Sequence, residues 1–153
     1  MKLLDFLKEE WVIPELNGTD KLSVLRELSE VLIKPCGVTS SGELMQVLLE
    51  RERLGSTGIG EGVAIPHGRL KRLKHFFVSF GRSTHGMDFD AIDHRPCQIF
   101  FMVMAPENSA VENLKLLSRI VTLLKESSFK KRLMDAHSQR ELFQILSAED
   151  EKY

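Results

Sequence analysis

The chain has 153 residues, of which 42% are hydrophobic and 28% are charged. This composition is typical of a globular domain and excludes disordered and collagen-like proteins. Because 21 Lys and Arg residues stand against 22 Asp and Glu residues, for a formal net charge of -1, the composition also gives no electrostatic basis for nonspecific binding to nucleic acid or to an anionic membrane.

We expect a single domain over residues 1–153, because the length suits one hydrophobic core and no linker or repeat interrupts it. Cys36 and Cys97 form no C-x-x-C motif and are predicted to be free thiols in that core. Asp5 and Lys8 break the first apolar run before it reaches the length of a signal peptide. No other stretch approaches the ~20 apolar residues of a membrane span, so we expect a cytoplasmic protein without membrane insertion.

The chain begins with a predicted helical turn at residues 3–8 and an extended segment at 11–13. Thr19 or Asp20 is expected to cap the first long helix, and Pro35 is expected to end it. Its buried stripe is predicted to comprise Leu22, Leu25, Leu28 and Leu32.

A second helix follows, starting at Ser40 and Glu43, which have capping-box spacing, and running to about Leu54. Its inner face is predicted to comprise Leu44, Val47 and Leu48.

Strands are expected at residues 63–65, 76–80 and 98–104. The third is apolar on both faces, which is typical of a central strand.

The helical period returns after Pro106. A long helix is followed by a shorter one near residues 129–136, and a capping box at Ser138 and Glu141 starts the last helix. Helices therefore flank a central group of strands, which predicts an α/β fold with a sheet covered on both faces. The buried stripe of the long helix is predicted to comprise Leu114, Leu117, Val121 and Leu124.

Glycines are concentrated between Gly55 and Gly68, where five of the ten in the chain fall. One interpretation is an anion cradle, in which amide groups around Gly58 and Gly60 and the hydroxyls of Ser56 and Thr57 face a phosphoryl group. The other is a tight connection between a helix and a strand. The segment is neither a P-loop, which needs Lys-Ser or Lys-Thr after its glycines, nor a Rossmann turn, which needs a strand before them.

His67 follows the strand predicted at residues 63–65 and lies between Pro66, which has a fixed φ, and Gly68, which leaves one side of the ring uncovered. It is either a structural histidine or, beside a glycine cradle, a nucleophile. The other histidines have no metal-ligand spacing, and the acidic segment 88–93 lacks the Gly and Glu of a calcium loop, so we interpret that segment as a turn with caps. No G-x-S-x-G motif offers a nucleophile for acyl transfer.

The segment 51–68, RERLGSTGIGEGVAIPHG, resembles the phosphorylation-site signature of the fructose/mannitol type IIA domains of the phosphoenolpyruvate-dependent sugar phosphotransferase system. Within that family the resemblance is strongest to the stand-alone nitrogen-regulatory members. Residues 86–93 and 100–107 and the C-terminal helical run are also similar to family segments, so the resemblance extends over nearly the whole chain.

The resemblance implies a mixed β-sheet sandwiched between helices. It implies that His67 accepts a phosphoryl group from the phosphohistidine of HPr or a nitrogen-branch relative, with Arg51 as a fixed positive charge. The hydroxyls of Ser56 and Thr57 and the glycine amides, including those of Gly58 and Gly60, would be neutral donors. Neither a metal nor an organic cofactor is implied. Asn113 occupies the position where the family usually has a second His. An asparagine can donate a neutral hydrogen bond there, but unlike a histidine it cannot carry a charge or shuttle a proton.

The function expected from the resemblance is that of a His-phosphorylated carrier in nitrogen, carbon or potassium regulation. Two alternatives stay open. One is a sugar-transport IIA component of fructose or mannitol type that passes phosphate to a IIB domain. The other is a regulatory module that binds a sensor kinase or a potassium transporter and in which Asn113 impairs phosphotransfer. The chain carries no fused IIB, IIC or HPr segment, and we interpret this as favouring regulation.

Overall fold

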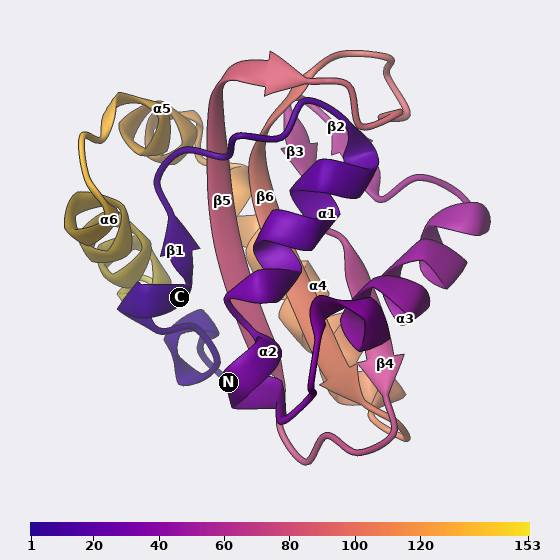
Figure 1. The fold of residues 1–153 in the computed structure, drawn as a ribbon. Helices are drawn as coiled ribbons and strands as arrows, with labels where there is room; N and C mark the ends of the chain where they lie inside the picture. The colour runs from indigo at the N-terminus through magenta and orange to yellow at the C-terminus, as the bar shows by residue number, and fades with distance from the viewer.

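A six-stranded mixed sheet forms the centre of the protein in the computed structural model, which describes residues 1–153 (Figure 1). The strand order is β1-β5-β6-β3-β2, and β4 pairs with β6 beyond the end of β3. Helices cover both faces, so the expected α/β sandwich is confirmed. The strands are β1 Val12–Ile13, β2 Gly58–Gly60, β3 Val63–Ala64, β4 His67–Leu70, β5 Phe77–Met87 and β6 Cys97–Pro106.

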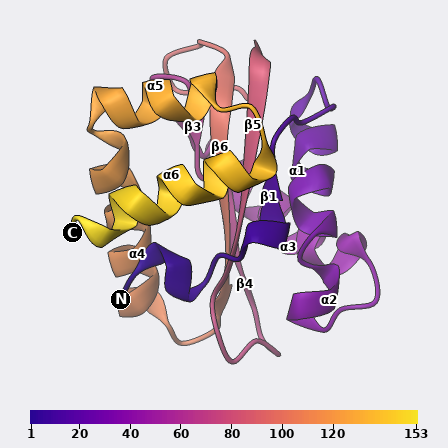
Figure 2. The ribbon, with the colours of Figure 1, turned by 90° about the vertical axis from the view of Figure 1, so that its left-hand side faces the viewer.

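The two faces of the sheet are covered by two sets of three helices. Figure 2 shows α1, α2 and α3 on one side and α4, α5 and α6 on the other. The N-terminal segment forms two 3-10 turns, Leu3–Asp5 and Glu9–Trp11, and the second of these takes in Trp11, which was expected in the first strand. No helix combines the length and the hydrophobicity that crossing a membrane requires. The helices are α1 Lys21–Glu30, α2 Ile33–Cys36, α3 Ser41–Arg53, α4 Ala110–Leu124, α5 Ser127–Asp135 and α6 Gln139–Glu151.

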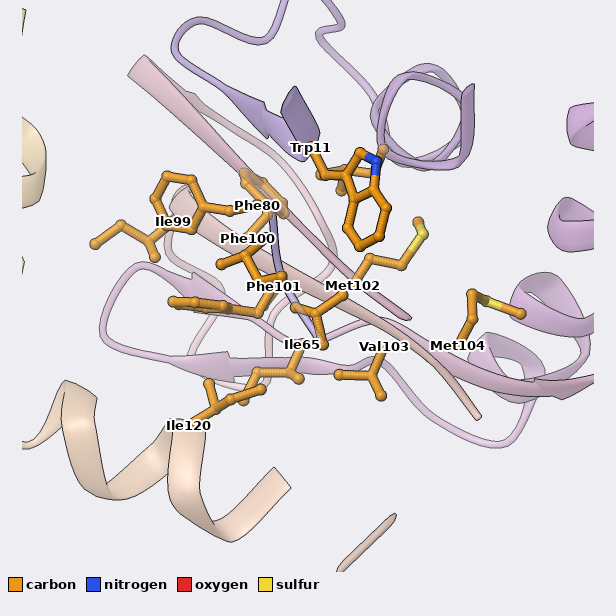
Figure 3. Close-up of a cluster of buried hydrophobic side chains, with 14 of the residues drawn as sticks. Trp11, Ile65, Phe80, Ile99, Phe100, Phe101, Met102, Val103, Met104 and Ile120 are labelled. Carbon is orange, nitrogen blue, oxygen red and sulfur yellow. The ribbon is translucent and has the colours of Figure 1, made fainter. Parts of the chain in front are cut away.

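Strand β6 is central, as its sequence predicts. It runs antiparallel to β5 and parallel to β3 and β4, and every residue from Ile99 to Ala105 is buried (Figure 3). Cys36 and Cys97 are free, buried thiols, and burial raises the pKa of each to about 11. A continuous apolar run suits a strand covered by helices on both faces.

Strand β5 extends seven residues past the predicted end at Phe80, and this extension includes the buried polar residues Arg82 and Ser83. The Arg82 side chain is 6% exposed and donates to the carbonyls of Pro14, at 3.0 Å, and Leu133, at 2.9 Å. A buried guanidinium with such partners is tolerated, but a hydrophobic pattern does not reveal it.

The predicted ends of the first helices need correction. Asp20 caps α1 by accepting the Ser23 N–H at 2.8 Å, but Leu22 is 46% exposed and α1 ends at Glu30. Pro35 does not end this helix; it lies inside the short α2, where a proline in the first turn needs no N–H partner. The capping box predicted at Ser40 is also wrong, since its side chain makes no cap hydrogen bond. In contrast, Ser138 accepts the Glu141 N–H at 3.1 Å and caps α6 as predicted.

The buried face of α4 differs from the predicted stripe. Leu114 is 66% exposed, and Leu117 and Val121 are only partly buried. Since α4 carries leucines on adjoining faces, a three-to-four spacing fits more than one stripe, and only contact with the sheet selects between them. The residues that α4 buries are Asn113, Leu116, Ile120, Leu123 and Leu124.

Candidate functional site

His67 begins strand β4 at an edge of the sheet. It is in register with Val103 of β6, whose N–H donates to the Pro66 carbonyl at 2.9 Å. The residue was expected at the end of the preceding strand, but β3 ends at Ala64 and β4 starts as a separate strand at His67. Pro66 lies between the two strands, so its fixed φ contributes to the break.

The His67 side chain faces the layer of helices that contains α4. Met102 of β6 faces the opposite layer, because its sulfur lies 3.8 Å from the Ser29 hydroxyl on α1. Side chains alternate along a strand, so Val103 faces the α4 side, as Figure 3 shows. His67 is in register with Val103 in the parallel ladder and therefore shares this face.

The His67 ring is held in one tautomer. Nδ1 lies 2.9 Å from the Ile65 carbonyl oxygen, which can only accept, so we assign the ring proton to Nδ1. The Nε2 atom then has a free lone pair. It has no hydrogen-bond partner and does not belong to the buried unpaired polar atoms, so it keeps contact with solvent. His67 can therefore act as a nucleophile through Nε2.

The surroundings keep His67 neutral. Burial of the ring lowers the pKa of His67 below its ordinary value of 6.5, and the positive charges of Arg51 and Arg69 lower it further. The Ile65 carbonyl and the Glu52 carboxylate oppose this shift by raising the pKa. A lowered pKa leaves the imidazole unprotonated at neutral pH, which is the nucleophilic form.

We expect the imidazole of His67 to titrate below pH 6.5 in an NMR titration over about pH 5 to 8. Because Nε2 takes up a proton only below this lowered pKa, any reaction of Nε2 should lose rate only on the acid side of 6.5. A midpoint for His67 at or above the ordinary value would contradict this prediction.

Arg51 lies in the last turn of α3 and acts electrostatically on His67. Gly68 makes this approach possible, since a Cβ on Gly68 would lie 2.9 Å from the Val47 side chain of α3. Arg51 is four residues after Val47, one turn further along the same helix face. One of its nitrogens, Nη1, donates to the Gly55 carbonyl at 2.8 Å, which leaves the other donors of the guanidinium free of protein partners.

The hydroxyls of Ser56 and Thr57 already have partners inside the protein. Ser56 donates to the Phe89 carbonyl at 3.0 Å and accepts the Gly58 N–H at 3.0 Å. The Thr57 hydroxyl donates to the carboxylate of Glu52. In this arrangement both side chains hold the loop, and neither hydroxyl proton is free for a ligand.

Gly58 and Gly60 lie in β2 and pack against the loop that follows β5. A Cβ on Gly58 would lie 2.8 Å from the Cα of Ala91, and one on Gly60 would lie 3.2 Å from the Asp93 carboxylate. The ladder pairs Gly60 with Val63, at the level of Ile99, whereas His67 is level with Val103. Four residues along a strand span about 13 Å, so the structure does not bring Gly60 to His67.

The loop 88–93 is a turn with Asp caps, as expected. Asp88 accepts the Asp90 N–H at 2.9 Å, and Asp93 accepts the N–H groups of Arg95 at 3.1 Å and Glu61 at 2.9 Å. Nowhere in the structure do three or more His, Cys, Asp or Glu side chains gather as a metal ion would require.

Asn113 lies in the first turns of α4, on the face of the sheet that His67 also faces. It is 8% exposed, and its Oδ1 atom is buried without a hydrogen-bond partner. A buried amide oxygen without a partner costs free energy, on the order of 1–3 kcal/mol. The position is therefore unusual for a residue whose only role is packing.

Glu52 and Lys21 were not among the predicted site residues. Glu52 follows Arg51 directly, and its side chain is 5% exposed and lies 2.9 Å from the Lys21 ammonium. The sequence does hold a signal for Glu52: it is four residues after Leu48, so it continues the buried stripe of α3. A carboxylate on such a stripe needs a buried partner.

The whole chain is similar to a known protein family. Residues 5–149 match the model of the phosphoenolpyruvate-dependent sugar phosphotransferase system, EIIA 2. A nitrogen regulatory protein of Bradyrhizobium diazoefficiens is 34% identical over 96% of this chain and 95% of its own. The fructose-specific EIIABC component of Bacillus subtilis is 32% identical over 98% of this chain, which corresponds to 24% of that longer protein.

A solved structure gives the same result for the fold. The nitrogen regulatory protein IIA-Ntr of Neisseria meningitidis has a TM-score of 0.86 and 32% sequence identity, covering 93% of this chain and 97% of that chain.

Proposed function

The chain belongs to the EIIA 2 family of the phosphoenolpyruvate-dependent sugar phosphotransferase system, and from this we propose that it is a phosphohistidine carrier of the nitrogen-regulatory type. In this proposal, His67 accepts a phosphoryl group from an HPr-like phosphocarrier protein. The observation that carries it is the His67 ring itself, with the proton of Nδ1 held by the Ile65 carbonyl and Nε2 unpaired at the surface. Since Nε2 keeps contact with solvent, a donor that is itself a protein can approach it.

The transfer is an in-line displacement on phosphorus. A bond forms between His67 Nε2 and phosphorus while the bond from phosphorus to the donor's imidazole nitrogen breaks, and the donor nitrogen keeps that electron pair. The Nδ1 proton stays on His67 and continues to bind the Ile65 carbonyl. No proton has to leave His67 before attack, because Nε2 is already unprotonated.

The negative charge of the transferring phosphoryl group is stabilised by protein groups. The free donors of Arg51 offset the negative charge on the phosphoryl oxygens, and Asn113 adds a neutral donor through its amide nitrogen. The protein partners found for Ser56 and Thr57 suit a role in holding the loop that follows α3, with Gly58 and Gly60 packed against Ala91 and Asp93.

The relatives support a regulatory role over sugar transport. A nitrogen regulatory protein is 34% identical to this chain over nearly its full length, and other similar relatives are also nitrogen regulatory proteins. A sensor kinase or a potassium transporter is then the proposed kind of regulated partner, and a IIB domain is the acceptor in the transport alternative.

The proposal is tested by incubating the protein with labelled phosphoenolpyruvate, the general phosphotransferase enzyme and either HPr or its nitrogen-branch relative. We expect acid-labile label on the protein with one of these carriers, and no onward transfer to a fructose or mannitol IIB domain. Label that passes rapidly to such a IIB domain would favour the transport alternative. No label with either carrier would favour the binding module with impaired transfer.

The Asn113→His variant tests the position where the family resemblance leads us to expect a second histidine. An imidazole at residue 113 can carry a charge, so we expect the phosphorylation rate or the phosphohistidine lifetime to become more dependent on pH between about pH 5 and 8. Asn113→Ala is the control, since it removes the amide without adding a titrating group. Identical pH profiles for the native protein and Asn113→His would place residue 113 outside the reaction.

A further inference from the structure

The partly buried ion pair of Lys21 and Glu52 has no part in the function proposed so far. It joins the first residue of α1 to the last turn of α3, with the ammonium 2.9 Å from the carboxylate. The side chains are 20% and 5% exposed. The Lys21 ammonium also lies 4.8 Å from the centre of the Phe89 ring and 3.7 Å from the Asp90 carboxylate.

The stability of α1 does not account for Lys21. A cation in the first turn of a helix is opposed by the positive end of the helix dipole. The desolvation of a buried ion pair further offsets its attraction, so such pairs are weak contributors to stability. The position of Lys21 is therefore explained better by what Glu52 holds.

Glu52 holds the loop before β2 through Thr57. Its carboxylate accepts the Thr57 N–H at 3.1 Å and also the Thr57 hydroxyl. The Thr57 carbonyl in turn accepts the Ile65 N–H at 2.9 Å. The Ile65 carbonyl is the group that holds Nδ1 of His67, also at 2.9 Å.

These contacts form one continuous series of hydrogen bonds from the ion pair to the nucleophile. It runs from Lys21 to Glu52, from Glu52 to the Thr57 N–H, from the Thr57 carbonyl to the Ile65 N–H, and from the Ile65 carbonyl to the His67 ring, with the backbone of Thr57 and Ile65 joining the hydrogen bonds. Glu52 is also adjacent in sequence to Arg51, so the same turn of α3 carries the cation that acts on His67.

We propose that the Lys21–Glu52 ion pair positions the phosphoryl acceptor, by fixing Thr57 and Ile65 so that the His67 ring keeps its proton on Nδ1 and presents Nε2. Lys21 and Glu52 are positioning residues, since neither touches the reacting atoms. The inference rests on the proposed function for its kinetic consequence, but the state of the His67 ring is measurable without any phosphotransfer.

The test uses Glu52→Gln, which keeps the shape of the side chain and removes its charge, and Lys21→Met, which removes the ammonium. We expect phosphorylation through the carrier to slow by about tenfold in each, as expected when an aligned nucleophile is loosened. Because both variants break the same pair, the double variant should be no slower than the slower single variant. Thermal unfolding of all three checks that the fold is retained.

Imidazole NMR separates positioning from a merely structural role. In both variants the fraction of His67 with its proton on Nδ1 should fall. The His67 pKa should move in opposite directions, because the Glu52 charge raises it. Removing that charge lowers the pKa, whereas removing Lys21 leaves the negative charge less neutralised and raises it.

Glu43→Gln is the matched control, because Glu43 lies on α3 like Glu52 and forms a more exposed ion pair. Its partner is Arg72, at 3.0 Å. This variant should leave the phosphorylation rate and the tautomer and pKa of His67 unchanged. A native His67 tautomer and pKa in folded Glu52→Gln and Lys21→Met would overturn the inference. If the native protein takes up no label at all, the proposed function fails, while the NMR result still decides the positioning role.

Discussion

Replacing His67 with Ala is expected to abolish acid-labile phosphate on the protein when it is incubated with phosphoenolpyruvate, the general enzyme and the carrier. Among the histidines, only His67 has a ring nitrogen in a hydrogen bond, and its other nitrogen has no partner and keeps contact with solvent. Without the Nε2 lone pair there is no nucleophile for the phosphoryl group. The measurement is the amount of label per protein after gel separation at alkaline pH.

His75→Ala is the matched control for this experiment, since His75 precedes β5 and has no ring hydrogen bond. It should take up label like the native protein. Label that persists in folded His67→Ala would show that another histidine is the acceptor and would contradict the assignment. Circular dichroism of the variant confirms folding, which we expect to be retained because the backbone ladder of β4 does not depend on the ring.

Replacing Arg51 with Ala is expected to slow phosphorylation by tenfold or more, a loss of about 1.4 kcal/mol or above in transition-state stabilisation. The guanidinium acts on the His67 ring and has donors free for phosphoryl oxygens. The His67 pKa should rise in the same variant, because a nearby positive charge is removed. Rapid-quench kinetics and an imidazole titration measure the two effects.

Arg53→Ala is the control for Arg51→Ala, since Arg53 is an exposed arginine on the same turn of α3 and makes no ion pair. The phosphorylation rate of Arg53→Ala should equal that of the native protein. Arg51 also donates to the Gly55 carbonyl at the end of α3, so thermal unfolding is measured for both variants. An unchanged rate in Arg51→Ala would place this residue on the solvated face of its helix.

Periodicity in the sequence predicted the helices and the central strand because these elements depend on local patterns. The three-to-four spacing of apolar residues in α1 and α3 is typical of helices, and the short continuous apolar run of β6, ended by Pro106, suits a buried strand. The same patterns did not reveal β4, in which His67 and Gly68 are only partly buried and Arg69 is exposed. A short edge strand with one partner carries little hydrophobic signal.

The site divides in the same way. Pro66, His67 and Gly68 are adjacent in sequence, and the sequence by itself predicted a histidine soon after a short apolar strand. In the structure, the space at Gly68 is taken by the Val47 side chain of α3. Family resemblance added Arg51, which the fold then brought near the ring. The glycine-rich segment forms a strand that packs closely against the loop at Ala91. This contact could not be predicted, because Ala91 is distant in sequence.

What the sequence determined about this protein is therefore the long helices, the central strand and the place of His67 beside a short strand and a glycine-rich segment, since these follow from short-range spacing and adjacency. The tertiary structure alone decided the tautomer of His67, the buried face of α4 and the ion pair of Lys21 and Glu52. Each of these depends on a partner brought close by folding, because burial, a hydrogen-bond acceptor and a counter-charge are properties of the surroundings and not of a residue type.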